Sequence, residues 1–163
     1  MSWPPTQIAP SLTSYTRGIT LASVLLPAPF SPMIATFSPA VIRKDGTVSL
    51  HPYGEHPIGR LTYDEAGRMS AHVMKPGRKS SITDPLVVTS ASCDELRQIA
   101  DGYVGYYGTF TLDEKSKTVI HHVESCTLPA WVGTDQTRHY EFVDAHLALS
   151  AGSGKAVWER LPR

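Results

Sequence analysis

The chain has 163 residues, of which 41% are hydrophobic and 18% charged, a balance that fits one folded domain and excludes a disordered chain. Fifteen Lys and Arg residues balance fifteen Asp and Glu residues, so the formal net charge is zero. Because the sequence has no excess of positive charge and no basic run, we expect neither a nucleic acid nor a membrane as a partner. Cys93 and Cys126 are expected to be free thiols, since a chain of this length buries a core without disulfides.

Residues 1–42 carry seven of the 13 prolines and show no sustained period. Proline removes a backbone donor, so we expect no central strand in this segment and leave its structure open. Three prolines interrupt the apolar stretch over residues 19–37, which argues against a membrane-spanning helix. A secretory signal in this region remains an alternative, and the default expectation is a cytoplasmic location. The folded domain is expected over residues 43–163.

From residue 43 onward the sequence alternates in the manner of β-strands. Asp45-Gly46 has the composition of a two-residue hairpin turn between short apolar runs. Residues 58–63 and 68–75 indicate two strands joined by a turn at residues 64–67. Further alternating segments occupy residues 104–112, 119–124, 137–142, 147–149 and 156–161. Their short connections predict sequential antiparallel pairing.

One helix of about ten residues is expected between these two groups of strands. Ser92 and Glu95 have the spacing of a capping box, and apolar residues recur at helical intervals from Leu96 to Tyr103. Gly102 is typical of the position that ends a helix.

The fold predicted from these elements is mainly β: a single antiparallel β-barrel of about eight strands with one short helix. A long meander exposes two edges unless it closes on itself, and closure into a barrel removes them. A flat sheet covered by the helix is the competing architecture. One short helix could not cover so many strands, so the barrel is favoured. An eight-stranded barrel has room for interior side chains or one small ligand.

Several segments also occur in the order typical of one protein family. They are Asp45-Gly46-Thr47 with His51-Pro52-Tyr53-Gly54, residues 57–63 with 67–71, residues 103–110, residues 121–124 with 129–136 and Arg138, and residues 157–160. This stretch resembles the lipocalin-like domains of bacteria and fungi. The resemblance implies a barrel with an enclosed cavity for a small, mostly apolar molecule. Some fungal relatives belong to secondary-metabolite pathways, where such barrels include binders and also cyclases that fold a reactive polyketide.

The chain departs from this family at its beginning. The family usually opens with a Gly-Thr-Trp segment that forms the first strand, and this sequence has none, since Trp3 is followed by two prolines. Either residues 1–42 supply an unusual first strand, or the natural chain begins elsewhere.

Two residues are candidates for chemistry because their strand phase points them inward. His121 shares a strand face with Val119 and Val123, and we predict it to be a proton-transfer group in the interior. Arg138 shares a face with Tyr140 and Phe142, where a buried guanidinium must meet an anion. It is predicted to stabilise charge on a ligand oxygen. The alternative is an internal ion pair, for instance with Glu124 or Asp135.

Other polar and aromatic residues are candidates for ligand binding. His122 shares the opposite strand face with Glu124, which could orient its imidazole, although a plain surface pair is the alternative. Trp131 lies in a loop that could cover the barrel mouth, and stacking on a flat ligand would suit it. The predicted ligand-binding residues are His72, Tyr106, His122, Glu124, Trp131 and Tyr140.

We expect no metal and no cofactor. His72, His121 and Glu124 would suit zinc or iron by ligand chemistry, but no spacing motif supports a site, and strand phase separates His121 from Glu124. Phosphate-loop, dinucleotide and nucleophile-elbow motifs are absent from the sequence.

The functional hypothesis is a barrel that binds a small apolar or aromatic molecule and acts on it as a cyclase or isomerase. The alternatives are a non-catalytic carrier and a structural protein with a filled core. A monomer or a homodimer is expected.

Overall fold

The structure is a computed structural model that describes residues 33–42, 48–143 and 146–160. The Asp45-Gly46 turn and the apolar residues before Met33 lie outside the described residues. Within them, nine strands form one sheet. The strands are β1 (Met33–Ile42), β2 (Val48–Leu50), β3 (Ile58–Tyr63), β4 (Arg68–Met74), β5 (Tyr103–Asp113), β6 (Thr118–Cys126), β7 (Asp135–Val143), β8 (His146–Ala151) and β9 (Gly154–Arg160).

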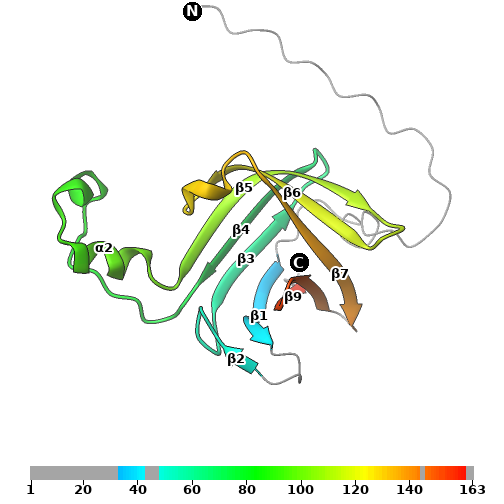
Figure 1. Cartoon of the computed structure of the whole chain (residues 1–163), viewed down its shortest axis with the longest axis horizontal. Helices are drawn as coiled ribbons and strands as arrows, with labels where there is room; N and C mark the ends of the chain where they lie inside the picture. Colours follow the sequence, from blue (N-terminus) through cyan, green and yellow to red (C-terminus); the bar gives the residue numbers. More distant parts are fainter. Residues whose placement is uncertain (1–32, 43–47, 144–145, 161–163) are drawn as a thin grey trace, which may run out of the picture.

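The sheet closes on itself. From β3 to β9, each strand pairs antiparallel with the next along the chain. The strand β1 pairs with β9 along its length and with β3 at its beginning, which completes a ring of eight strands (Figure 1). The short strand β2 pairs with the end of β1. The predicted mainly-β barrel of about eight strands is therefore confirmed.

The strand β1 lies in the segment where we expected no central strand, and that expectation is wrong. The register between β1 and β9 shifts between Phe37 and Ala40, so that Pro39 falls in an irregularity of the ladder. A proline is tolerated at such a position because no donor is required of it. The first described strand, Met33–Ile42, thus lies ahead of residue 43, and it supplies a strand of the ring where the Gly-Thr-Trp opening is missing.

The turn between β3 and β4 forms as predicted. The carboxylate of Asp64 accepts hydrogen bonds from the backbone N–H of Arg68, at 2.8 Å, and from its Nε, at 2.7 Å. Gly67 has φ of +77°, a conformation that a residue without Cβ adopts at little cost.

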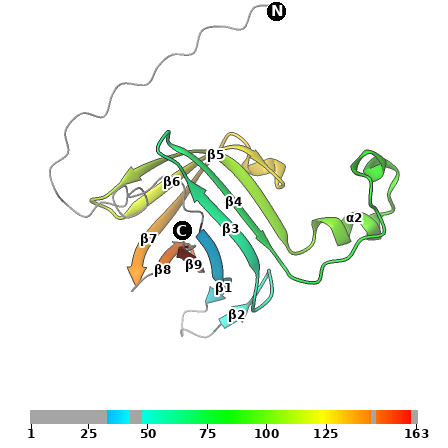
Figure 2. The same cartoon turned by 180° about the vertical axis from the view of Figure 1, so that it is seen from behind.

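The predicted helix is present as α2 (Cys93–Ala100), and both hydrogen bonds of the Ser92–Glu95 capping box are formed. It is shorter than predicted, because Tyr103 begins β5 instead of continuing the helix. No residue of α2 is buried. The helix and the 3₁₀ turn η1 (Pro85–Ser90) project from the barrel on an arm between β4 and β5 (Figures 1 and 2). The helix therefore covers no face of the sheet.

The core of the described residues lies inside the ring. Its members come from every strand from β3 to β9, and they are mostly aliphatic and aromatic. Cys93 is exposed and Cys126 half-buried, and both are free thiols, as predicted. Across the described ranges, no helix combines the length and the apolar character needed to cross a membrane.

Candidate functional site

His121 lies inside the barrel, on the face that its strand phase predicted. Its neighbours of the same phase on β6, Val119 and Val123, are buried, and His121 itself is 0% exposed. The cross-strand partners of His121 are Phe110 on β5 and Gln136 on β7. The imidazole is thus one of the few polar groups within an apolar core.

Two tyrosine hydroxyls hold the imidazole from both sides. The Oη atom of Tyr63 lies 2.7 Å from Nε2 of His121, and the Oη atom of Tyr106 lies 3.0 Å from Nδ1. We call Tyr63, His121 and Tyr106 the tyrosine–histidine chain. With a neutral imidazole, one ring nitrogen donates to a hydroxyl and the other accepts from the second hydroxyl.

The surroundings keep the three groups of the tyrosine–histidine chain uncharged. Burial, reinforced by the positive charge of Arg138 and by His122, lowers the pKa of His121 from its ordinary 6.5 to about 3. Burial also raises the pKa of Tyr63 and of Tyr106 above the usual value for a phenol. A base with so low a pKa takes up a proton poorly at neutral pH, because general bases work best near the operating pH.

The lowered pKa predicts a pH-dependent stability. The unfolded chain takes up a proton at His121 near pH 6.5, whereas the folded chain does not, so stability is full above pH 6.5 and falls as the pH drops toward 3. Between pH 6.5 and pH 4.5 the free energy of unfolding should fall by about 2–3 kcal/mol. Urea unfolding of the wild type and of His121→Gln over this range checks this. Equal slopes in the two proteins would contradict a neutral, buried His121.

Arg138, on β7, lies close to the tyrosine–histidine chain. Arg138 is half-buried, its positive charge acts on the hydroxyl of Tyr106, and its Nη1 donates to the carbonyl of Thr137 at 2.9 Å. It also lies over the ring of Trp131, 5.7 Å from the centroid. None of the salt bridges among the described residues includes Arg138. The alternative of an internal ion pair with Glu124 or Asp135 is therefore wrong.

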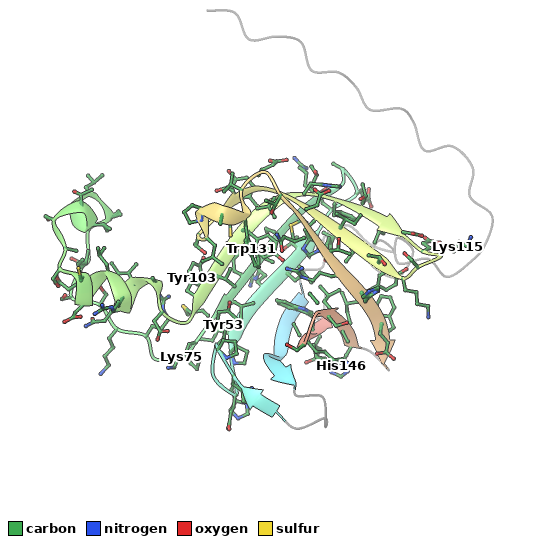
Figure 3. The ribbon with its side chains drawn as sticks, in the orientation of Figure 1. Tyr53, Lys75, Tyr103, Lys115, Trp131 and His146 are labelled. Carbon is green, nitrogen blue, oxygen red and sulfur yellow. The ribbon has the colours of Figure 1, made fainter. Side chains whose placement is uncertain are left out.

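Trp131 supplies an aromatic ring beside Arg138 and Tyr106. It ends the 3₁₀ turn η2 (Pro129–Trp131) between β6 and β7, and its half-buried ring packs against the core. Its ring meets Tyr106 edge to face at 5.7 Å between centroids. Figure 3 places Trp131 and Tyr53 toward the end of the barrel that carries the α2 arm, away from Lys115. An aromatic, cationic corner of the core therefore lies toward one end of the ring.

Tyr140 also faces the interior, as its phase predicted, but on another side. It is buried, pairs with Leu149 on β8 and stacks edge to face with Phe142. Burial raises the pKa of Tyr140, and Glu114 and Asp113 of the β5–β6 turn raise it further. Tyr140 therefore lies beside the turn between β5 and β6, where its backbone N–H donates to the carbonyl of Lys117 at 2.9 Å.

The structure does not bring the other three predicted ligand-binding residues into the interior. His72 is exposed on β4, with Nδ1 2.9 Å from the hydroxyl of Tyr103. His122 is half-buried and Glu124 exposed on the outer side of β6. As ligand contacts these three positions stay predictions, and the hydrogen bonds of His72 and His122 go to residues outside the tyrosine–histidine chain.

The predicted partner of His122 needs a correction. The register of β6 and β7 sets His122 opposite Asp135, and Nδ1 lies 2.6 Å from Oδ1 of Asp135. Its Nε2 lies 3.1 Å from the hydroxyl of Thr111. Glu124 is displaced because the register of β5 and β6 shifts between Tyr107 and Gly108, which leaves Glu124 without an opposite residue. A β-bulge of this kind re-aims side chains and is not visible in a simple alternation.

Two interior residues were not among the candidates. Tyr63 shares a strand face with the buried Leu61 on β3, so its strand phase alone could have indicated it. Trp158 on β9 is 4% exposed, and its indole Nε1 is buried without a hydrogen-bond partner among the described residues. No sequence signal reports an unsatisfied donor, because that depends on tertiary packing. Within the described part of the chain, no group of three or more His, Cys, Asp and Glu residues is placed to hold a metal ion.

Comparison with known proteins places the chain in a family. The model of the lipocalin-like domain matches residues 37–160, and the chain belongs to that family. A curated relative from Aspergillus oryzae is 31% identical over 111 residues, covering 58% of this chain and 98% of the relative. That relative is named a 4'-hydroxy-3'-methoxypropiophenone carrier protein.

Proposed function

We propose that this barrel binds a small, mostly apolar molecule that carries at least one oxygen function, and releases it unchanged. The relative's ligand is an aromatic ketone, and we extend that class to this chain. The observation that carries the proposal is the tyrosine–histidine chain inside an apolar core, together with Arg138, which forms no salt bridge with a described residue. Arg138 and Trp131 would hold the polar edge and the flat face of such a ligand.

The energetics of buried polar groups support a binding role. Such groups contribute little net stability even when they are hydrogen-bonded, and apolar groups of the same shape can replace them at nearly no cost. A chain that needed only a core would be served as well by phenylalanine and leucine at these positions. The polar groups are therefore better explained by recognition of a ligand.

Carriage is favoured over catalysis by the state of His121. A pKa of about 3 leaves a neutral imidazole that is already hydrogen-bonded at both nitrogens. Such a group orients a ligand well but accepts a proton poorly. A cyclase or isomerase of secondary metabolism is the second candidate, and the observation behind it is Arg138, whose free charge could stabilise an enolate.

A binding titration with a matched control tests the proposal. The wild type should bind 4'-hydroxy-3'-methoxypropiophenone in isothermal titration calorimetry. Trp131→Ala should bind it about tenfold more weakly, because it loses the aromatic face beside Arg138. Val132→Ala, next in the chain but exposed, should bind like the wild type. Equal affinities of the two variants would contradict the site.

Mass spectrometry of the ligand recovered after incubation separates the two candidate functions. A carrier returns the compound unaltered, whereas a cyclase or isomerase returns an isomer of equal mass with a different chromatographic retention. A cytoplasmic location, the absence of a nucleic-acid partner, and a monomer or homodimer stay predictions.

A further inference from the structure

Trp158 places an unused donor in the core. Its strand lies between β8 and β1, where Leu147 and Ala35 are its cross-strand partners, and the following residue, Glu159, is exposed. The indole N–H can only donate a hydrogen bond, and no acceptor among the described residues meets it. A buried donor without a partner costs free energy, so a bound molecule with an acceptor would be stabilised there.

The tyrosine–histidine chain holds a second unused donor. Two hydroxyls and a neutral imidazole carry three polar hydrogens, whereas the two contacts of the chain use two of them. If Nε2 carries the proton, the hydrogen of Tyr63 is left over, and if Nδ1 carries it, the hydrogen of Tyr106 is left over. In either tautomer, one hydroxyl hydrogen has no acceptor within the tyrosine–histidine chain.

Arg138 adds positively charged hydrogen-bond donors beside the tyrosine–histidine chain. A guanidinium has five N–H groups, and the hydrogen bond of Arg138 among the described residues goes to the carbonyl of Thr137. Gln136, a half-buried amide beside it, donates from Nε2 to Thr134 at 2.9 Å. His51 has the other buried nitrogen without a partner among the described residues, and it lies in the loop before β3. The unused groups on the barrel strands are thus mainly donors.

We infer that the interior recognises its ligand through buried donors, so that the ligand turns acceptor oxygens toward Trp158 and the tyrosine–histidine chain. The class is an aromatic ketone, ether or ionised phenol, and it excludes ammonium compounds, which bring donors and positive charge. This inference rests on the proposed function. It adds Trp158 as a specificity-determining residue and fixes the polarity of the ligand's contacts.

Three probes with the same nine-carbon skeleton test the inference on the whole chain: propiophenone, n-propylbenzene and 1-phenylpropan-1-amine, each titrated calorimetrically at pH 7. The ketone should bind at least about tenfold more tightly than the hydrocarbon, and the protonated amine should not bind. The ketone is the better hydrated of the first two, so its preference requires a donor in the protein. Trp158→Phe should lower the ratio of ketone to hydrocarbon affinity about three- to tenfold.

The outcomes separate the inference from the proposal on which it rests. If none of the three probes binds, the carrier function itself fails. If the hydrocarbon binds as tightly as the ketone, or if the amine binds best, the carrier function survives and the donor inference is overturned. Circular dichroism confirms that Trp158→Phe is folded. Should it not fold, Arg138→Gln takes its place, with the same fall in the ratio expected, and an unchanged ratio in the variant tested would overturn the inference.

Discussion

His121→Leu should lower the free energy of unfolding by about 2–4 kcal/mol. The substitution leaves the hydroxyls of Tyr63 and Tyr106 buried without their shared partner. Each unsatisfied hydroxyl costs about 1–3 kcal/mol, and the burial of leucine offsets a part of that loss. Urea unfolding at pH 7 measures the difference. A loss below about 1 kcal/mol would contradict the buried hydrogen bonds.

The triple variant Tyr63→Phe/His121→Leu/Tyr106→Phe is the matched control. It removes all three polar groups together, so no buried hydroxyl is left without a partner, and most of the lost stability should return. The same protein should lose affinity for the aromatic ketone, because the oriented hydroxyls and the imidazole between them are gone. A stable triple variant that binds normally would show that the tyrosine–histidine chain does not serve recognition.

Gly108→Ala should destabilise the barrel by about 3 kcal/mol or more, because the β-bulge leaves no space for a side chain. A Cβ atom at Gly108 would lie 1.9 Å from the carbonyl oxygen of His122 and 3.0 Å from the backbone nitrogen of Glu124. Both atoms belong to the backbone of β6, so only a shift of the strand relieves the overlap. Thermal unfolding should show a midpoint lower by roughly 8 °C.

Gly154→Ala is the control for that substitution. A Cβ atom there meets the carbonyl oxygen of Ala151 at 3.5 Å, an ordinary van der Waals contact, and the backbone is not in the left-handed region. The midpoint of Gly154→Ala should lie within about 2 °C of the wild type. Similar midpoints for the two alanine variants would contradict the close approach of β5 and β6 at the bulge.

The fold could be predicted from the sequence where local signals agree with one another. Alternation in β3 to β9, the Asp64–Gly67 turn and the Ser92–Glu95 capping box each depend on neighbouring residues only, and each formed as predicted. The strand β1 could not be predicted, because Pro39 argues locally against a strand. Only the tertiary ladder with β9 shows that the proline falls where no donor is needed.

The candidate site could be predicted as far as strand phase reaches. Phase placed His121, Tyr106 and Tyr140 inward, since a two-residue period needs no knowledge of partners. Phase failed for the partner of His122, because the bulge and the β6–β7 register select Asp135 instead of Glu124. The unsatisfied indole of Trp158 is a property of the closed ring and has no counterpart in local sequence.

The location of a bound ligand tests the account most directly. A crystal structure of the protein with 4'-hydroxy-3'-methoxypropiophenone should show the unaltered compound inside the ring of β1 and β3 to β9. Its ring should contact Trp131, and a ligand oxygen should lie within hydrogen-bond distance of Trp158 Nε1 or of a hydroxyl of the tyrosine–histidine chain. A compound bound on the outer face, beside His72 or His122, would contradict the account.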